Sequence, residues 1–312
     1  MPPKVSIQIP TYNQQAFIQN SIESCLMQDY ANLEINIADD HSTDDTYALL
    51  QPYLKDPRVR FFTNEQNLGR VANYHKALYV YATGEWAINL DGDDYFIDKS
   101  FISTAIEIIK SLHDEKIVAY QGNHDIKKII KVLPASEQIN EDTILVDGPA
   151  YFLNYYKILN FHHCAVMYKR SEALKLNFYS FNCLFTDFNS VFKLFVNGKL
   201  LLSAKKVAVW HEHEGNESST LDEKKIKIEL KAINELADFA ALSLPYKLVE
   251  KWRRKMKGYF VSIYLDLQTT SRQNRMAVKQ LIFDFHLDTV YFRQLAKAIL
   301  GSLGLQFKRT SK

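Results

Sequence analysis

The stretch Trp86-Ala87-Ile88-Asn89-Leu90-Asp91-Gly92-Asp93-Asp94 runs from a short apolar segment into three carboxylates. The apolar part is typical of a buried strand. Three acids within four residues repel one another unless a cation or strong hydrogen-bond donors neutralise them. Ligands that are all oxygen favour Mg²⁺ or Mn²⁺ over zinc. An exposed Asp-Gly turn between two strands is an equally good interpretation of this stretch alone.

The segments around this stretch alternate between strand and helix patterns. Residues 5–9 alternate apolar and polar side chains before Pro10, and residues 16–28 carry apolar side chains at helical spacing. The same criteria give strands at 33–37, 59–62 and 86–90, and helices at 43–54 and 71–81. Such alternation predicts an α/β fold with a mostly parallel, Rossmann-like sheet flanked by helices.

Polar clusters follow three of the predicted strands. Thr11-Tyr12-Asn13, Asp39-Asp40-His41-Ser42 and Asp91 to Asp94 all fall at carboxyl ends of strands, where sheets of this type bind ligands. A hairpin at Asp91 to Asp94 would interrupt the parallel pattern, which favours the metal over the turn. The Asp39-Asp40 pair could bind a base or a ribose, or help to cap the next helix.

The pattern changes after a helix predicted at residues 98–112. Short strands at 117–120, 128–133, 164–168 and 200–209 mix with helices at 147–156 and 187–196, and from Thr220 the pattern is helical throughout. The chain therefore divides into residues 1–115, 116–219 and 220–312. The middle part would lie over the open end of the sheet, where an acceptor could bind.

The helical part is strongly basic towards its end. From Tyr246 to Lys312 there are fourteen Lys and Arg against four Asp and Glu, whereas residues 1–245 hold 24 against 32. Apolar stripes lie at 226–237, 248–264 and 292–303. We expect residues 290–312 either to dock peripherally on an anionic membrane surface or to pack on the protein. Packing, on the rest of the chain or on a second subunit of a homo-oligomer, is favoured for 220–265.

The remaining features are those of an ordinary globular chain of 312 residues. Three cysteines without metal-ligand spacing suit a reducing cytoplasm. There is no signal-peptide pattern, and no apolar run of the roughly 18 residues that a membrane span needs. The patterns G-x-x-x-x-G-K-[ST] and G-x-G-x-x-G are also absent, which disfavours P-loop and dinucleotide-binding proteins.

Five motifs occur in order along the chain: Pro10-Thr11-Tyr12-Asn13, Asp39 to Thr46, Asn67-Leu68-Gly69, Gly84-Glu85-Trp86 and Leu90 to Asp94. Together, over residues 4–215, they resemble family 2 glycosyltransferases, which are inverting enzymes of the GT-A fold. The resemblance implies a nucleotide-sugar-binding half at 1–115, an acceptor-binding half with the general base at 116–219, and a helical basic C-terminal region at 220–312.

The resemblance also implies donor-site roles. Asp93 is the implied metal ligand, Asp91 is shared between metal and ribose, and Asp94 is structural. His213, after the last predicted strand, is implied as a further contact of the metal or the diphosphate. The implied cofactor is Mn²⁺ or Mg²⁺. Nucleotide-binding residues are implied at Pro10, Thr11, Tyr12, Asn13, Asp39, Asp40, Asn67, Arg70, Asn73, Asp91 and Gly92.

The implied general base is Asp187. Phe185-Thr186-Asp187-Phe188, followed by Asn197-Gly198-Lys199, occupies the place where the family has its base ahead of a helix and a Gly-Lys turn. Thr186 stands where the family commonly has an acid. Asp187 would take the proton of the acceptor hydroxyl as that oxygen attacks the anomeric carbon. His162 and His163 lie in the expected acceptor region, with no assigned role.

The implied function is metal-dependent, inverting transfer of a hexosyl or N-acetylhexosaminyl group from a nucleotide-sugar, by default a UDP-sugar. The acceptor is a glycan or a lipid-linked sugar, and no nucleic acid is involved. The implied setting is bacterial surface polysaccharide or lipopolysaccharide synthesis, in the cytoplasm or at the inner face of the cell membrane. Two alternatives stay open: an inactive sugar- or nucleotide-binding protein on the same fold, and a nucleotidyltransferase.

Overall fold

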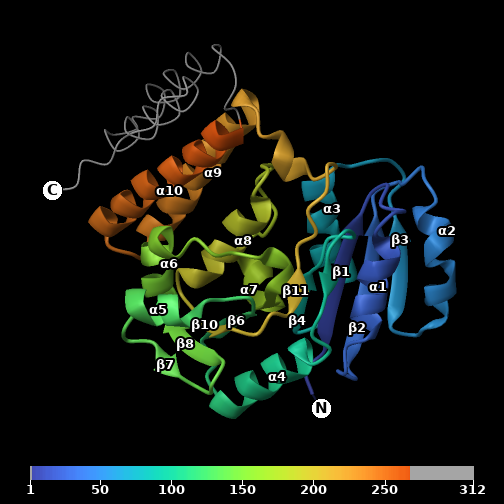
Figure 1. Cartoon of the computed structure of the whole chain (residues 1–312), viewed down its shortest axis with the longest axis horizontal. Coiled ribbons are helices and arrows are strands. Elements are labelled where there is room, and N and C mark those ends of the chain that lie inside the picture. Colours follow the sequence, from blue (N-terminus) through green and yellow to red (C-terminus); the bar gives the residue numbers. More distant parts are fainter. Residues whose placement is uncertain (1, 268–312) are drawn as a thin grey trace, which may run out of the picture. The chain divides into compact units, whose positions relative to one another are not determined.

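The computed structural model describes residues 2–267 (Figure 1). The chain forms two compact units. Within the described residues, the first runs to Asn182 and resumes at Thr186–Glu212, and the second combines Cys183–Phe185 with residues 213–267. The predicted stripe at 292–303 and the basic segment 290–312 lie outside the described residues. The functional division at residues 115 and 219 remains a prediction.

Among the described residues, nine strands form the sheet of the first unit, in the order β3-β2-β1-β4-β9-β6-β10-β8-β7. They are β1 (Val5–Thr11), β2 (Leu33–Asp39), β3 (Val59–Thr63), β4 (Trp86–Asn89), β6 (Ile117–Gln121), β7 (Glu137–Gln138), β8 (Thr143–Asp147), β9 (Val166–Lys169) and β10 (Lys199–Ser203). β3, β2, β1 and β4 pair in parallel, as do β6 and β10. β9 runs antiparallel to both β4 and β6, and β8 runs antiparallel to β10. The predicted α/β fold, with a mixed second half, is confirmed.

Helices connect these strands. They are α1 (Ile18–Leu26), α2 (Thr46–Leu50), the 3-10 helix η1 (Gln51–Lys55), α3 (Arg70–Lys76), the π-helix η2 (Ala77–Tyr81), α4 (Phe101–Leu112), α5 (Ile126–Val132), α6 (Gly148–Ile158), the 3-10 helix η3 (His163–Ala165), α7 (Arg170–Lys175) and α8 (Thr186–Phe195). The helix expected at 43–54 is shorter, because Pro52 lies where α2 gives way to η1.

The strand expected at residues 128–133 is wrong, because this segment is helix α5. Its apolar residues Ile126, Ile129 and Ile130 recur at the spacing of a helix face. The Asp125 carboxylate caps the helix by accepting the Lys128 N–H at 3.0 Å. The helical spacing and the N-terminal cap together account for the helix.

The two faces of the sheet differ in polarity. On one face the apolar side chains of β1, β2 and β4 are fully buried in a core that α1 and α4 share. On the other face the alternate residues are equally buried but polar. Such alternation ordinarily marks a strand with one solvated face, but here α3 and η2 pack against β1 and β2. The buried polar residues are Ser6, Gln8, Glu34, Asn36 and Asn89.

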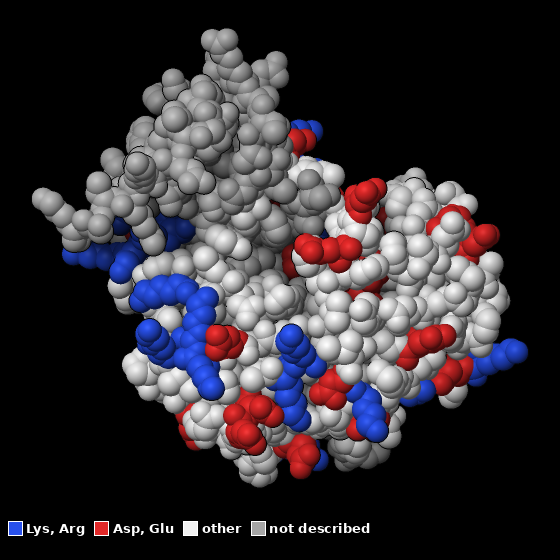
Figure 2. Space-filling view, in the orientation of Figure 1, with Lys and Arg blue, Asp and Glu red and all other residues white. Residues whose placement is uncertain are grey.

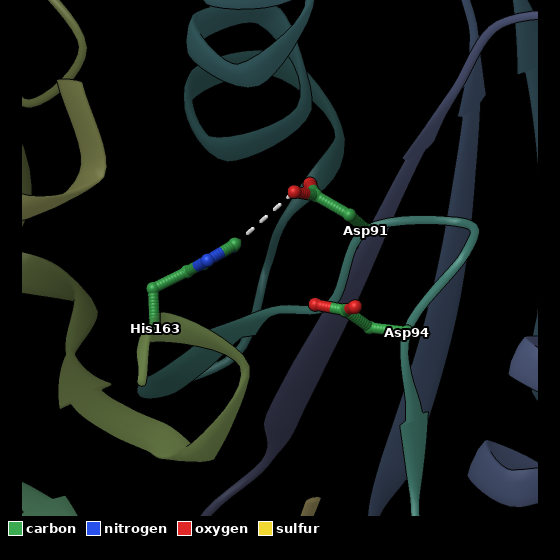
Figure 3. A group of neighbouring side chains, drawn as sticks. All are labelled: Asp91, Asp94 and His163. Atoms are coloured by element: carbon green, nitrogen blue, oxygen red, sulfur yellow. Dashed lines mark ion pairs between the residues drawn. The ribbon is translucent and has the colours of Figure 1, made fainter. Parts of the chain in front are cut away.

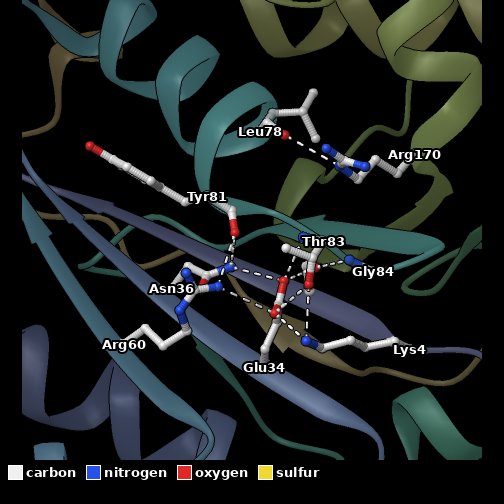
Figure 4. A network of polar contacts seen from close by, with 10 residues as sticks. Lys4, Glu34, Asn36, Arg60, Leu78, Tyr81, Thr83, Gly84 and Arg170 are labelled. Carbon is white, nitrogen blue, oxygen red and sulfur yellow. Dashed lines mark hydrogen bonds and ion pairs between the residues drawn. The ribbon is translucent and has the colours of Figure 1, made fainter.

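Glu34 is the charged member of this polar face (Figure 4). Its carboxylate accepts hydrogen bonds from Ser6 Oγ (2.5 Å) and from Thr83 N and Oγ1 (2.7 and 2.8 Å), and pairs with Lys4 Nζ (2.5 Å) and Arg60 Nη1 (3.5 Å). Burial would raise the pKa of Glu34, but the donors from Lys4, Ser6 and Thr83 lower it to about 2. The network joins β1, β2 and the residues before β4 at the edge where these strands begin.

The acidic stretch forms a turn but no hairpin. The Asp94 N–H donates to the Asp91 carbonyl (2.9 Å), and the chain then enters β5 (Tyr95–Phe96). β5 pairs with β11 (Ala208–Val209) in a separate two-stranded sheet. β4 keeps its parallel pairing with β1, so the turn lies at the carboxyl edge of an undisturbed sheet.

The described second unit contains η4 (Glu217–Thr220), α9 (Glu223–Ala241) and α10 (Tyr246–Leu267). α9 and α10 pack against each other, which accounts for both predicted stripes, except that Leu248 is 48% exposed. Their buried side chains include Ile226, Leu230, Ile233, Ala237, Trp252, Met256, Phe260 and Tyr264. Within residues 2–267, no helix combines the length and the apolar composition that crossing a membrane requires.

Charged side chains are unevenly spread over the face shown in Figure 2. Lys side chains gather over α5 and α6, where Lys127, Lys128, Lys131 and Lys157 are exposed. Acidic side chains lie over other parts of this face. The described surface thus has a basic area of its own, apart from the predicted basic tail.

Candidate active site

Four titratable side chains meet at the carboxyl edge of the sheet, where β1, β2 and β4 end. Because β9 runs antiparallel to β4, His163, the first residue of η3 and three residues before β9, comes to the edge at which β4 ends. We call Asp91, Asp94, His163 and Asp187 the carboxylate–histidine cluster. Figure 3 shows three of them, with the His163 ring directed at Asp91 and the Asp94 carboxylate beside both.

Asp91 is held by neutral donors. Its Oδ1 accepts the Tyr74 hydroxyl at 2.5 Å and lies 3.3 Å from the Asn89 amide nitrogen. The side chain is 25% exposed. Burial raises the pKa of Asp91, and Asp93 adds to this, which outweighs the opposing effect of His163. The carboxylate is therefore ordered but lacks full charge compensation.

Asp94 is 1% exposed. One oxygen accepts the His211 N–H at 3.0 Å, while Oδ2 is buried without a hydrogen-bond partner. Burial, and then the Asp91 charge, raise the pKa of Asp94 to about 8. Asp91, Asp94 and His163 each offer one possible metal-ligand atom, and these three atoms lie within 4.8 Å of one another. An orphaned carboxylate oxygen beside a second carboxylate suits a hard divalent cation.

His163 lies between two acids. Its Nε2 is 3.7 Å from Asp91 Oδ2, and its Nδ1 is 3.4 Å from Asp187 Oδ2. The His163 and Asp187 side chains are 13% and 16% exposed. Burial lowers the pKa of His163, but the charges of Asp91, Asp187 and Asp94 outweigh it, so the pKa is raised. One imidazole therefore connects the predicted base to the end of β4.

Arg70, at the start of α3, adds a cation to this neighbourhood. Its guanidinium lies over the Tyr74 ring, 5.2 Å from the centroid. It also interacts electrostatically with Asp187 and Asp91. A guanidinium in such a place suits the oxygens of a phosphate. The structure thus brings Arg70 together with Asp91 and Asp187, three residues that the sequence assigned to separate motifs.

The loops after β1, β2 and β4 are tied to one another. Asn13, with a left-handed φ of 52°, donates its N–H to Ser42 Oγ (2.9 Å) and accepts the Thr43 N–H (2.8 Å). A Cβ on Gly92 would run into Gln14 and come 2.9 Å from Thr11 Oγ1. The Gly92 N–H donates to the Pro10 carbonyl. Tyr12 is 46% exposed, which leaves its ring available for stacking.

Asp39 and Asp40 are both buried and bound to the loops around them. Asp39 accepts the Ser42 N–H and hydroxyl and the Thr63 hydroxyl. Asp40 accepts the Asn64 amide and the N–H groups of Leu68 and Gly69, each at 2.8 Å. These contacts shape the loops after β2 and β3, and a nucleotide contact of either acid stays a prediction.

The other donor-site residues differ in their exposure. Asn73 is buried, and its side chain donates a hydrogen bond to the Ala38 carbonyl (2.7 Å), so it stabilises the end of β2. Asn67 is exposed, and its side-chain oxygen accepts a hydrogen bond from the Gly69 N–H. Asp93 is half-buried, and its charge acts on Asp91. His213 belongs to the second unit, where Nδ1 accepts the Gly215 N–H (3.1 Å). Metal roles for Asp93 and His213 stay predictions.

Sequence reasoning left His163 without a role. Its position depends on β9 entering the sheet antiparallel between β4 and β6, and strand pairing of this kind leaves no local mark in the sequence. Asp94 was assigned a structural role, and its His211 contact agrees with that. Its Oδ2, however, is buried without a hydrogen-bond partner, and its carboxylate lies close to Asp91 and His163.

The model of glycosyl transferase family 2 matches residues 6–174, more than half of the chain. The chain belongs to this family. Relatives of this family 2 glycosyltransferase include a GalNAc(5)-diNAcBac-PP-undecaprenol beta-1,3-glucosyltransferase of Campylobacter jejuni, 34% identical over 40% of both chains. Another is the Escherichia coli UDP-Glc:alpha-D-GlcNAc-diphosphoundecaprenol beta-1,3-glucosyltransferase WfaP, 35% identical over 45% of this chain and 55% of that protein. The matches thus span about half the length of these curated relatives.

A solved structure shows the same fold. S. aureus TarS 1–349 in complex with UDP-GlcNAc has a TM-score of 0.68 to this family 2 glycosyltransferase, at 16% identity over 98% of this chain and 93% of that one. The likeness confirms the GT-A architecture. The family and its named relatives are glycosyltransferases, which favours that class over the nucleotidyltransferase alternative.

Proposed function

We propose that this enzyme transfers a sugar, with inversion at the anomeric carbon, from a UDP-sugar to a hydroxyl of a glycan or lipid-linked acceptor. The observation that carries the proposal is the meeting of Asp187 and Asp91 in one cluster. A carboxylate in place to take a proton lies beside the strand end that would hold the donor diphosphate. Relatives named for UDP-Glc and for diphosphoundecaprenol-linked acceptors support this substrate class.

The cluster fits a divalent cation, Mn²⁺ or Mg²⁺. Asp91 and Asp94 would hold it, because one buried Asp94 oxygen has no hydrogen-bond partner and the Asp94 carboxylate lies close to that of Asp91. Asp93 and His213 are the further ligands that the sequence predicts. Bound there, the cation neutralises negative charge on the diphosphate that leaves.

The side chains of the chain itself account for the remaining chemistry. Asp187 takes the proton as the acceptor O–H bond breaks, and the acceptor oxygen bonds to the anomeric carbon. The bond from that carbon to the diphosphate oxygen breaks, and its electron pair leaves with the nucleotide. Arg70 binds the phosphate oxygens, and Tyr12 stacks on the base. A single displacement of this kind inverts the anomeric centre.

The test is a donor-hydrolysis screen with UDP-glucose, UDP-N-acetylglucosamine, UDP-galactose and GDP-mannose, with Mn²⁺ or Mg²⁺. We expect a UDP-sugar to be hydrolysed fastest and chelation by EDTA to abolish turnover. Loss of the base should lower kcat about 10²- to 10⁴-fold in Asp187→Asn, and Asp93→Asn should lose metal-dependent activity. Asp29→Asn changes an exposed acid after α1 and is the matched control. Wild-type kcat in Asp187→Asn would refute the base assignment, and an inactive wild type would favour the sugar-binding alternative.

Two partner predictions stay open to measurement. Liposome sedimentation with and without residues 290–312 tests the membrane contact, and light scattering tests the homo-oligomer. Equal, negligible sedimentation of both forms would remove the membrane contact.

A further inference from the structure

We propose that His163, held by Asn89, is a positioning residue that orients the Asp187 carboxylate for proton transfer. The inference rests on the proposed function, in which Asp187 is the general base. It gives the imidazole a role other than metal ligand, although the ring lies in the same cluster as Asp91 and Asp94.

Asn89 determines which nitrogen of His163 carries a hydrogen. The Asn89 amide nitrogen lies 3.3 Å from Asp91 Oδ1 and 3.0 Å from His163 Nε2. A carboxylate oxygen accepts hydrogen bonds, so the NH₂ end of the amide is the end that faces Asp91. Its second hydrogen then points to Nε2, which must accept it. The hydrogen of the ring is therefore on Nδ1.

Nδ1 is the nitrogen that faces Asp187. Its distance of 3.4 Å from Asp187 Oδ2 is slightly longer than an ordinary hydrogen bond, as is common at catalytic contacts before substrate binds. Nδ1 carries a hydrogen in this neutral tautomer and in the imidazolium alike, so the direction of the contact does not depend on the charge of the ring. Oδ2 is thereby oriented by His163, and Oδ1 is presented as the base.

The same geometry separates the imidazole from the metal ligands. The lone pair on Nε2 is directed at the Asn89 amide, and Nδ1 is directed at Asp187. The Asp94 oxygen, by contrast, is buried with no hydrogen-bond partner. The cation is therefore left to the carboxylates, while His163 serves the base.

The test compares kcat, KM and the Mn²⁺ activation constant for hydrolysis of the UDP-sugar that the full-length enzyme turns over fastest. His163→Ala should lower kcat about 10- to 100-fold, as losses of orienting partners do. The donor KM and the Mn²⁺ constant should stay within about twofold of wild type. His163→Asn, whose amide can donate near the Nδ1 position, should recover part of kcat. His113→Asn, at an exposed site after α4, is the matched control.

A double-mutant cycle shows whether His163 acts through Asp187. If it does, adding His163→Ala to Asp187→Asn should change the residual rate by less than about twofold, because the two residues act as a unit. Thermal unfolding of every variant shows which are folded, and His163→Asn supplies the answer should His163→Ala not fold.

Three outcomes would overturn the inference. One is wild-type kcat in His163→Ala and His163→Asn while Asp187→Asn is inactive, which leaves the proposed function standing. Another is a large rise in the Mn²⁺ constant, which would make the imidazole a metal ligand. The third is a full additional loss from His163→Ala in the Asp187→Asn background. Full activity of Asp187→Asn, in contrast, is a failure of the proposed function itself.

Discussion

His124 is 4% exposed, and neither of its ring nitrogens has a hydrogen-bond partner. Its ring lies edge-on to Tyr151, with centroids 6.3 Å apart. Burial, and to a smaller extent the charge of His162, lower the pKa of His124 to about 3. The imidazole is therefore neutral in the folded protein, and it gains its proton readily only when the chain unfolds.

This burial predicts a loss of stability in mild acid. The pKa of His124 rises from about 3 in the folded protein to an ordinary 6.5 on unfolding. The stabilisation that the neutral imidazole gives the folded state is therefore fully present above pH 6.5 and is lost as the pH falls towards 3. Between pH 7 and pH 5 the free energy of unfolding should lose about 2 kcal/mol through this residue. Urea unfolding of wild type and His124→Phe over this range measures the difference.

In His124→Phe an aromatic ring is kept and the titration is removed, so its stability should fall less between pH 7 and pH 5. His113→Asn removes an exposed histidine instead and should keep the wild-type slope. Identical slopes for wild type and His124→Phe would show that the imidazole is protonated within the folded state.

Local motifs are enough to propose roles for single residues, but they give no information on residues whose position depends on tertiary pairing. Asp91 follows a predicted strand, and the role proposed for Asp187 came from the resemblance to the family, at the start of a helix. His163 could not be assigned a role, because its contacts depend on which strands flank β9. The position of the Asp94 carboxylate depends on a backbone N–H more than a hundred residues away, at His211, which donates to Oδ1.

At the scale of elements, Glu34 connects the beginnings of β1, β2 and β4. Glu34→Gln keeps the shape but replaces one acceptor oxygen by an NH₂ group, which cannot accept from Thr83 or pair with Lys4. We expect the free energy of unfolding to fall by about 1–3 kcal/mol, the cost of leaving buried hydrogen-bonding groups without a partner. Urea unfolding at pH 7 measures this loss.

Donor hydrolysis by folded Glu34→Gln should keep its kcat, since Glu34 lies at the edge opposite the carboxylate–histidine cluster. Glu107→Gln, on the exposed side of α4, is the control for stability. A loss under about 0.5 kcal/mol, the range of ordinary surface changes, would contradict a structural role for the network.

Element boundaries also show what patterns can predict. The alternation in β1 was sufficient to identify a strand, but it gave no sign that the polar side would be covered by α3 and η2. The strand predicted at 128–133 is wrong, because the Asp125 cap and the spacing of the isoleucines produce the helix Ile126–Val132.

For the whole molecule, the second unit contains the peptide that directly precedes α8. The buried carboxylate of Glu229, on α9, accepts the N–H groups of Leu184 (2.5 Å) and Phe185 (3.3 Å). The next residues, Thr186 and Asp187, begin α8. The C-terminal helices thus order the chain immediately before the proposed base.

Glu229→Gln should therefore lower kcat, by about three- to tenfold if the loosened peptide costs about 1 kcal/mol of positioning. A glutamine can accept only one of the two N–H groups well, because its other end is a donor. Steady-state hydrolysis measures the effect, and Glu235→Gln, exposed on the same helix, is the control. Equal kcat in both variants would show that α9 has no influence on Asp187.

The antiparallel course of β9 has a consequence for how mutations could damage this enzyme. Its pairing with β4, with Tyr168 opposite Ala87, sets how far along the edge His163 lies. A slip of one residue would displace it by about 3.3 Å and turn every side chain of β9 to the opposite face. A deletion between α6 and β9 could therefore disable the enzyme without removing any residue of its site.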